Sequence, residues 1–404
     1  MKKIDSYKLF IGTAFYFRFC WALMTTVSMV YMVTVVGLDP LQMVLVGTVL
    51  ELSSFLFEIP TGVVADVYSR RLSIILGYIT VGLGFVLLGL FPRFDIVLLS
   101  QVIWGFGFTM ISGASQAWIS DEIGEKRANQ SFIVASQVGK LGLLLGIAVC
   151  IVLATIDLSV PIITGSLGLV LLGFFCIVFM DEKSYKPEVP DERETWAQLA
   201  NTLTKGISLL KSHPVLWIII VIAVFEGMYS EGYDRLNAPF LIESFEFPDL
   251  AGLDTVIWWG VMSAGATVFS FIAVEILRRY IDTSNYRQLV LVLTISSALL
   301  VAVMFSFALA GNFYIALIAY FCVASLRSIK GPLSTAWLNQ NLSSDTRATM
   351  FSIQAQADAL GQVGGGPIIG AIGKFISLPV ALIVSSFALV PAIGLYRRAL
   401  KAKQ

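Results

Sequence analysis

Long apolar runs alternate with short polar connectors along almost the whole chain. About 20 consecutive apolar residues are enough to cross the hydrocarbon core of a bilayer as one helix. Twelve runs reach that length, near residues 8–36, 41–64, 72–91, 96–119, 130–154, 159–180, 214–240, 255–277, 288–310, 313–337, 349–373 and 378–397. The pattern therefore predicts an all-α polytopic membrane protein with twelve transmembrane helices.

Composition and charge agree with this interpretation. Of the 404 residues, 57% are hydrophobic and 13% are charged, which is unlike a soluble domain. If the amino terminus is cytoplasmic, the basic residues of the connectors gather on the inner side, against Arg93 and Lys374 outside. The positive-inside rule then predicts that both termini are cytoplasmic, in a cell (inner or plasma) membrane. The net charge of zero argues against nucleic acid as a partner.

A hydrophilic stretch at 181–213 separates six runs from six. It predicts a cytoplasmic linker, with an amphipathic surface helix from Glu194 to Leu210, between helical bundles at 1–180 and 214–404. An internal repeat crosses this linker at an offset of 219 residues. Ser115, Ala117, Trp118, Phe132, Gln137 and Gly142 recur as Ser334, Ala336, Trp337, Phe351, Gln356 and Gly361. The repeat predicts two six-helix bundles related by pseudo-symmetry.

A short polar segment between the second and third runs carries the most specific motif. It contains Gly62, Asp66, Arg70 and Arg71 in the pattern Gly-x-x-x-Asp-x-x-x-Arg-Arg, and we call residues 62–71 the hinge. Glycine lets helix ends approach closely, while the acid and bases can form an ion pair at the membrane surface. The motif resembles the loop signature of the major facilitator superfamily of transporters. The sequence Glu-x-Pro-Thr-Gly that ends at Gly62 is similar to the end of the second helix in bacterial drug:proton antiporters of that superfamily.

The hinge has a partial copy in the second half. Glu275 and Arg279 stand where Asp66 and Arg70 stand, at an offset of 209, while Phe271 replaces the glycine. We expect both acid–base pairs to act as gating elements, with Asp66 and Arg70 forming a cytoplasmic latch that steadies an outward-open state.

Charged residues inside the predicted spans are the candidate transport machinery. A charge at the centre of a span costs roughly 2.5–3.5 kcal/mol, so such residues usually face a polar pathway. Arg18 lies roughly 15 Å into the first span and Glu226 roughly 18 Å into the seventh, at pseudo-symmetric positions 208 residues apart. The resemblance implies a central cavity lined mainly by helices one, four, seven and ten, and we expect these two residues to share one polar network there.

Other intramembrane charges extend this set. The cavity cations are predicted to be Arg18, Arg327, Lys330 and Lys140, and the proton-coupling candidates are Glu226, Asp358 and Glu51. Arg327 and Lys330 share one helix face, as do Gln354 and Asp358. A buried carboxylate beside a cation can load and lose a proton as its surroundings change. The alternative is that these groups form fixed ion pairs that only hold the helices together.

Aromatic residues at helical spacing are candidates for an apolar substrate pocket. They are Tyr16, Trp21, Trp104, Phe108 and Tyr229, with ordinary packing as the alternative interpretation. Two further sets are expected at the solvent boundary. Glu231, Asp234 and Arg235 are predicted to form a solvated rim, and Asp121, Glu122, Lys126 and Arg127 a solvated loop. Trp118 and Trp337 are expected at the membrane interface.

The sequence argues against an enzyme. One histidine, and four cysteines that all fall inside predicted spans, indicate neither a metal site nor a disulfide framework, and no cofactor is expected. No Gly-x-x-x-x-Gly-Lys loop is present, so ATP is not the expected energy source.

From these features and the resemblance we expect a monomeric secondary transporter that works by alternating access. Its partners would be a small-molecule substrate, protons as the coupling ion and the surrounding lipids. Efflux of drug-like or amphipathic compounds is the leading prediction. The alternatives are a proton-coupled uptake symporter of a small solute, and a receptor or lipid-handling protein on the same fold.

Overall fold

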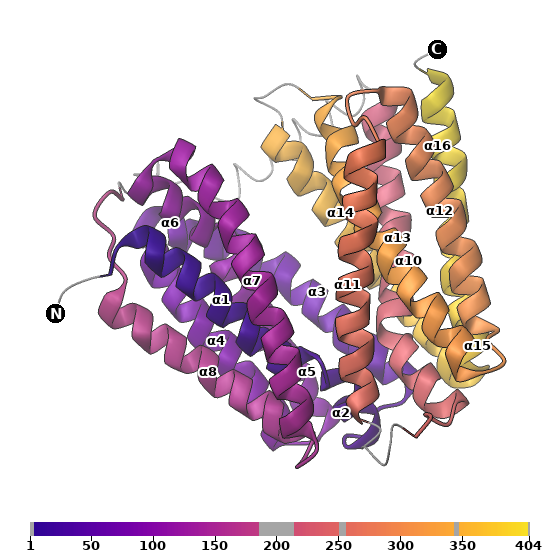
Figure 1. Cartoon of the computed structure of the whole chain (residues 1–404), viewed down its shortest axis with the longest axis horizontal. Helices are drawn as coiled ribbons and strands as arrows, with labels where there is room; N and C mark the ends of the chain where they lie inside the picture. The colour runs from indigo at the N-terminus through magenta and orange to yellow at the C-terminus, as the bar shows by residue number, and fades with distance from the viewer. Residues whose placement is uncertain (1–3, 186–213, 250–255, 343–346, 403–404) are drawn as a thin grey trace. The chain divides into compact units, whose positions relative to one another are not determined.

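The computed structural model describes residues 4–185, 214–249, 256–342 and 347–402, and every regular element within them is helical (Figure 1). The first half contains α1 (Ser6–Thr25), α2 (Ser28–Thr34), α3 (Pro40–Val63), the π-helical turn η1 (Val64–Tyr68), α4 (Arg70–Leu90), α5 (Phe94–Ile111), α6 (Ala114–Ile123), α7 (Glu125–Ala154) and α8 (Ser159–Phe179). The second half contains α10 (Pro214–Ser244), α11 (Val256–Tyr280), α12 (Tyr286–Ala308), α13 (Phe313–Asn339), α14 (Arg347–Phe375), α15 (Leu378–Ala388) and α16 (Val390–Ala402). The predicted linker helix at Glu194–Leu210 lies outside the described residues.

All twelve predicted spans are helical, and three of them are interrupted. Within the described residues, eleven helices are long and apolar enough to cross a membrane. The remaining predicted span is α14, whose 29 residues include several polar side chains and glycines. The interruptions separate α1 from α2, α5 from α6 and α15 from α16. Gly113, with a φ of 75°, lies at the second break. The third break is at Leu389, two residues before Pro391, which has no backbone N–H to donate to the preceding turn.

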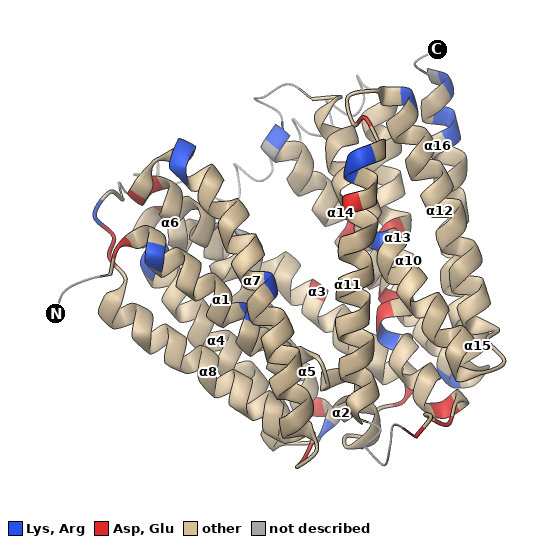
Figure 2. Ribbon diagram, in the orientation of Figure 1, with Lys and Arg blue, Asp and Glu red and all other residues tan. Residues whose placement is uncertain are grey.

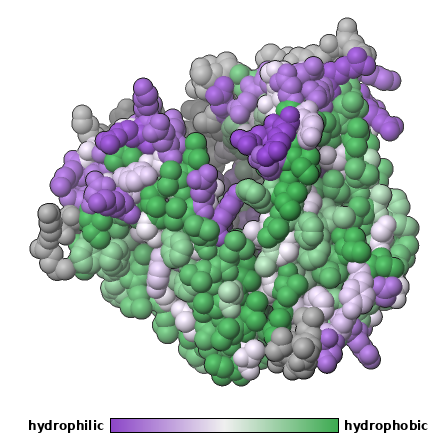
Figure 3. Space-filling model, in the orientation of Figure 1, coloured by the Kyte–Doolittle hydropathy of each residue, from purple (hydrophilic) through white to green (hydrophobic). Residues whose placement is uncertain are grey.

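Apolar side chains cover the outer surfaces of the helices. On the face drawn in Figure 3 they occupy the middle of the helices, while hydrophilic residues gather toward the helix ends. Leu141, Phe269 and Ile318 are among the large apolar residues that are exposed. Such a surface suits lipid as its solvent, which confirms a multi-pass membrane protein.

The chain forms two compact units, which are described separately. Unit 1 comprises Met1–Leu38, Val49–Thr195 and Leu250–Gly260, and unit 2 comprises Asp39–Thr48, Trp196–Asp249 and Val261–Gln404. Helices α3 and α11 contribute residues to both units. The boundaries expected at 180 and 214 stay a prediction.

One pair of closely packed helices forms the centre of each unit. In unit 1, α1 packs along α7, and a Cβ at Gly142 or Gly146 would collide with backbone carbonyls of α1. In unit 2, α10 packs along α14, where a Cβ at Gly361 would collide with the carbonyl of Val224 and one at Gly365 with Met228. Small residues allow such backbone approach between membrane helices. The glycine patterns of the sequence therefore correspond to real helix contacts, at positions 219 residues apart.

Three expectations about the solvent boundary are wrong. Asp121 and Glu122 lie in the last turn of α6 rather than in a loop, because only Gly124 separates α6 from α7. Trp118 is 3% exposed and Trp337 is 1% exposed, so both are core residues rather than interface residues. The indole N–H of Trp118 donates to the carbonyl of Asp181 at 2.8 Å, which satisfies its polar end inside the unit.

Candidate functional site

The hinge of unit 1 forms ion pairs between three elements. Arg70, at the start of α4, donates to the carboxylate of Asp121 in α6, and its Nε lies 3.9 Å from Oδ1 of Asp66 in η1. The copy in unit 2 is also paired, since Glu275 contacts both Arg278 and Arg279 at 2.9 Å.

The other two hinge residues, Arg71 and Gly62, have different surroundings. Arg71 donates through Nη2 to the carbonyl of Ile177 at 2.7 Å. A Cβ at Gly62 would meet no atom within 4 Å, so the close approach expected at this glycine is not made. The proposed gating roles stay predictions.

Unit 2 contains a chain of opposite charges between α10 and α13, visible as neighbouring red and blue segments in Figure 2. Lys330 donates to the carboxylate of Glu226, and Arg327 holds Asp234 through both guanidinium nitrogens. The more C-terminal carboxylate on α10 pairs with the more N-terminal cation on α13, which is the order that antiparallel helices give. The predicted shared face of Arg327 and Lys330 is therefore the face toward α10.

Tyr229 lies between the two ion pairs. Its ring is 5.9 Å from the guanidinium carbon of Arg327 and 5.8 Å from Nζ of Lys330. A tyrosine face attracts cations, so the ring stabilises both charges. Tyr229 is 3% exposed. Tyr229 contacts the ion pairs and is not among the residues that line the cavity of unit 2, so its substrate role stays a prediction.

The solvated rim expected toward the end of α10 is wrong for two of its three residues. Glu231 and Arg235 are 3% and 9% exposed and form a buried ion pair at 3.0 Å. They lie one helical turn apart, so the pair is formed within α10 itself. A Cβ at Gly47 would collide with both side chains, which is why glycine stands there. Asp234 is 42% exposed at its side chain and pairs with Arg327.

Glycines bring another carboxylate, that of Asp358, close to the Glu226–Lys330 pair. A Cβ at Gly227 of α10 would collide with the carbonyl of Asp358, and one at Gly361 of α14 with the carbonyl of Val224. The two backbones approach closely at this level, which positions Asp358 beside the segment that carries Glu226. Asp358 accepts a hydrogen bond from the Gln362 side chain at 2.8 Å. Among the described residues no lysine or arginine nitrogen lies within 4 Å of its carboxylate.

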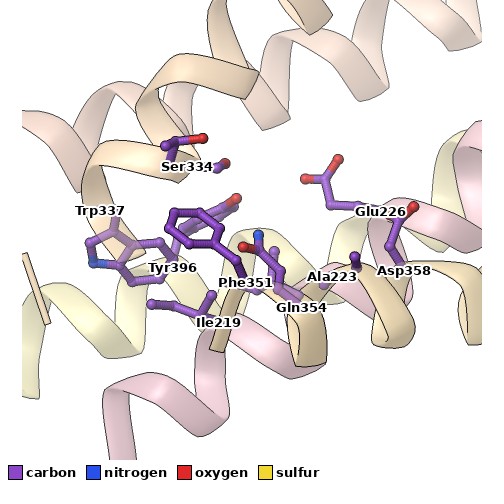
Figure 4. A pocket seen from close by; sticks show the side chains of 12 residues that line it. Ile219, Ala223, Glu226, Ser334, Trp337, Phe351, Gln354, Asp358 and Tyr396 are labelled. Carbon is purple, nitrogen blue, oxygen red and sulfur yellow. The ribbon is translucent and has the colours of Figure 1, made fainter. Parts of the chain in front are cut away.

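A cavity of about 300 Å³ opens onto these carboxylates. Figure 4 shows Glu226 and Asp358 near one end and Ile219, Trp337 and Tyr396 near the other. Its lining comes from α10, α13, α14 and α16: Ile219, Ile222, Ala223, Glu226, Ser334, Thr335, Trp337, Phe351, Gln354, Ala355, Asp358 and Tyr396. The cavity therefore combines an apolar, partly aromatic wall with hydroxyl, amide and carboxylate groups. Gln354 and Asp358 both face it, as their spacing predicts.

Several lining residues were not singled out as site candidates. Phe351 and Tyr396 have no charge to mark them in a sequence of apolar helices. Ser334, Trp337 and Phe351 nevertheless belong to the internal repeat, and that recurrence is a signal that pointed toward this region.

Charged candidates in unit 1 are arranged differently. Arg18 lies on an exposed part of α1 with its stem close to Gly139 of α7, and it makes no hydrogen bond or ion pair with described residues. Lys140 is exposed on α7, and Glu51 is half-buried on α3. Because Arg18 and Glu226 belong to different units, their shared network stays a prediction; within unit 2 the partner of Glu226 is Lys330.

Aromatic candidates in unit 1 divide into two sets. The rings of Trp21 and Trp104 meet edge to face with centroids 5.4 Å apart, and each contacts Phe85, at 6.2 and 4.9 Å, which is a packed cluster. Tyr16 and Phe108 are 36% and 43% exposed. The cluster favours the packing interpretation for the two tryptophans, and the substrate role of all four stays a prediction.

The described residues contain eleven apolar spans, two glycine-packed helix pairs and ion pairs inside the helices. These are features of a membrane transporter. The chain belongs to the Major Facilitator Superfamily, whose sequence profile matches residues 9–366. It is 24% identical over 363 residues to YxaM of Bacillus subtilis (strain 168), described as an uncharacterized MFS-type transporter; the match covers 88% of this chain and 86% of YxaM. The protein is thus a secondary transporter of this superfamily.

Solved structures support the fold. A bacterial homolog of the human lysosomal transporter Spinster, in an inward-facing and unoccupied conformation, has a TM-score of 0.75 at 14% identity and covers 99% of this chain and 98% of its own. A mutant of the nucleoside transporter NupG has a TM-score of 0.76 at 15% identity, with 97% and 99% covered. A POT family transporter in complex with 5-aminolevulinic acid has a TM-score of 0.72 at 15% identity, with 98% and 95% covered. At these identities the likeness shows the fold alone.

Proposed function

We propose that the protein is a proton-coupled exporter of small amphipathic, drug-like compounds, and that Asp358 is the carboxylate at which a cationic substrate and a proton compete. It acts as a monomer in the cell membrane with both termini cytoplasmic. The observation that carries the proposal is the cavity of unit 2, in which one carboxylate has a cation partner and the other has none among the described residues.

Charge balance is the first step of the argument. Glu226 is neutralised by Lys330, whereas within the part of the chain that the structure describes Asp358 is bonded to the neutral amide of Gln362 and to no cation. A carboxylate away from bulk water is costly unless it is paired or protonated. When Asp358 holds a proton the cavity is neutral; when a cation binds, the proton leaves and the cation restores neutrality. One site can then exchange one proton for one positive charge.

The cavity wall supplies the second step. Ile219, Phe351 and Tyr396 offer apolar and aromatic surface to the body of a ligand. Ser334 and Gln354 offer hydrogen-bonding groups that orient it. A mostly apolar pocket with a few polar groups is typical of small-molecule sites. This combination favours a compound with a compact apolar body and one amine or other cationic group.

One observation favours proton-coupled uptake as the second candidate. Glu226 lines the cavity and is paired with Lys330 behind it, so a small movement of the pair would offer both signs of charge to a zwitterionic solute. A receptor or lipid-handling role has no comparable support from the described residues.

The test is an accumulation panel in cells that lack their own drug pumps. Expression should lower the cell content of the lipophilic cation tetraphenylphosphonium, and a protonophore should abolish the difference. Asp358→Asn should remove export, while Asp282→Asn, at an exposed carboxylate bonded to Ser284, should keep it. A rise in cell content would favour uptake, and export that persists with the protonophore would exclude proton coupling.

A further inference from the structure

Five residues, Asp181–Tyr185, begin after Met180 at the end of α8 and fold back onto unit 1, and we call this segment the strap. The Trp118 indole donates to the Asp181 carbonyl at 2.8 Å. The backbone N–H groups of Lys183 and Ser184 both donate to Oε1 of Glu122, at 2.7 and 3.0 Å. The strap is thereby fixed to α6 through both backbone and side-chain groups.

Glu182 of the strap reaches the amino end of α4. Its carboxylate accepts hydrogen bonds from the Ser69 hydroxyl at 2.5 Å and from the Arg71 backbone N–H at 3.0 Å. Ser69 is itself the N-cap, whose oxygen accepts from the Leu72 N–H at 2.9 Å. A carboxylate at this position satisfies an N–H that the helix cannot pair and opposes the positive end of the helix dipole.

Tyr185 reaches the other side of the hinge. Its hydroxyl donates to the carbonyl of Asp66 at 2.6 Å, and its ring lies 5.8 Å from the guanidinium carbon of Arg70. Burial and then the nearby Glu182 carboxylate raise the pKa of Tyr185, so the hydroxyl keeps its proton and remains a donor. The ring and hydroxyl therefore contact both residues of the predicted latch.

Arg70 lies near two carboxylates, those of Asp121 and Asp66, and is closer to Asp121. It donates to Asp121, while its buried Nε has no hydrogen-bond partner and lies 3.9 Å from Asp66. A small movement of η1 toward α4 would give Arg70 a second close carboxylate. The strap opposes that movement because Tyr185 holds the Asp66 backbone and Glu182 holds the start of α4.

We propose that Glu182 and Tyr185 are positioning residues of the transport cycle, which fix the start of α4 and keep Arg70 on Asp121 rather than Asp66. The proposal goes beyond the proposed function, because it depends on neither the substrate nor the coupling ion. Its chemistry is a carboxylate cap, a tyrosine hydroxyl bond and a ring beneath a guanidinium, all contributed by the strap.

Hydrogen–deuterium exchange on the full-length protein in lipid nanodiscs tests the positioning directly. Glu182→Ala should speed exchange of the amides at 69–72 by about 5-fold or more, because the N-terminal cap is lost. Glu182→Gln should give an intermediate increase, since its amide oxygen still accepts. Tyr185→Phe should speed exchange in η1. Lys183→Gln is the matched control, because the Lys183 side chain is 75% exposed and pairs only with Asp181 among described residues.

Transport kinetics provide the second measurement. The turnover number for tetraphenylphosphonium in proteoliposomes should fall about threefold or more in Glu182→Ala and Tyr185→Phe, while KM stays within about twofold, because the strap does not touch the cavity. Exchange of α12 amides should be unchanged, which separates positioning from general unfolding.

Unchanged hinge exchange in both variants would overturn the proposal, as would faster exchange with full turnover. If wild type does not transport tetraphenylphosphonium, the proposed function fails for that compound. The hydrogen–deuterium exchange result alone then decides whether Glu182 and Tyr185 position the hinge.

Discussion

The two central helix pairs share one packing scheme and differ in the chemistry they carry. In α1 and α7 the glycines Gly142 and Gly146 lie against backbone carbonyls, as Gly361 and Gly365 lie against α10. Around the first pair, Arg18 and Lys140 are exposed cations. Around the second, two carboxylates of α10 are paired with two cations of α13, and Asp358 stands without one among the described residues.

This difference shows which property the repeat preserves. A glycine permits close helix contact because it has no side chain, and at Gly142 and Gly361 the recurring glycine and the close contact are found together. Charge depends on the identity of each residue, and Arg18 and Glu226 already differ in sign at equivalent positions. The carboxylate chemistry on which we base proton coupling therefore lies in unit 2.

The largest expected effect comes from breaking the Glu226–Lys330 pair. Lys330→Met should destabilise the protein by about 3–5 kcal/mol, because it leaves Glu226 without its cation in a region with little water. The equivalent loss of charge in unit 1, Arg18→Met, should cost less than about 1 kcal/mol, since Arg18 has no ion pair among the described residues. Equilibrium unfolding in mixed micelles measures both.

The double variant Lys330→Met with Glu226→Gln is the control for that experiment. It removes both charges, so most of the lost stability should return. Equal costs at Lys330 and Arg18 would contradict the contrast between the units.

A smaller effect tests the shared packing. Gly142→Ala and Gly361→Ala should each destabilise the protein by roughly 1–3 kcal/mol, because the new methyl group meets a backbone carbonyl in both helix pairs. Gly364→Ala is the matched control: a Cβ there meets nothing within 4 Å, and alanine favours helix more than glycine. Thermal unfolding of the three variants measures the contrast, and a cost at Gly364 as large as at Gly361 would refute it.

The smallest effect concerns two carboxylates in connectors. Burial raises the pKa of Asp39, but hydrogen bonds from the Gln42 N–H and the Lys374 ammonium outweigh it, so the pKa lies below its usual value. In unit 1, hydrogen bonds from the Ser159 hydroxyl and N–H lower the pKa of Asp157. Both groups therefore stabilise the fold above the usual Asp pKa, and this contribution is lost as the pH falls through the lowered value.

Salt distinguishes these two carboxylates. Asp39→Asn should cost less than about 1 kcal/mol and lose its effect at high salt, because Lys374 is a partly exposed ion-pair partner. Asp157→Asn should respond little to salt, since its partners are the neutral groups of Ser159. Unfolding at two pH values and two salt concentrations measures both, and equal salt responses would contradict the assignment.

Hydrophobic runs were sufficient to predict the spanning helices, because a bilayer requires continuous apolar length. The breaks after Thr25 and at Leu389 were not predicted, because the apolar runs continue on both sides of them; Thr25, Thr26 and Pro391 are the local residues that could have marked them. Gly142 and Gly361 were marked by the internal repeat, and glycines inside membrane helices commonly allow such tight contacts. The open surroundings of Gly62 were not, because they depend on the helices around the hinge.

Site chemistry was predicted in part. The positions of Glu226 and Asp358 follow from their depth in the spans, and the shared face of Arg327 and Lys330 follows from their spacing. The partner of each charge does not, because it depends on the register of α10 against α13. The buried Glu231–Arg235 pair was missed for a related reason: one helical turn of spacing permits either a solvated or a buried pair.

The most direct test of the central claim is gradient-driven transport in proteoliposomes, scored beside substrate exchange without a gradient. Asp358→Asn removes the carboxylate at which the cation and the proton compete, so accumulation of tetraphenylphosphonium under an imposed pH gradient and its exchange without a gradient should both fall by about tenfold or more. Glu226→Gln keeps that carboxylate, so exchange should continue while gradient-driven accumulation falls. Asp282→Asn should retain both activities. If Glu226→Gln and Asp358→Asn both keep full gradient-driven transport, proton coupling does not reside in unit 2, and Glu51 of unit 1 becomes the next carboxylate to test.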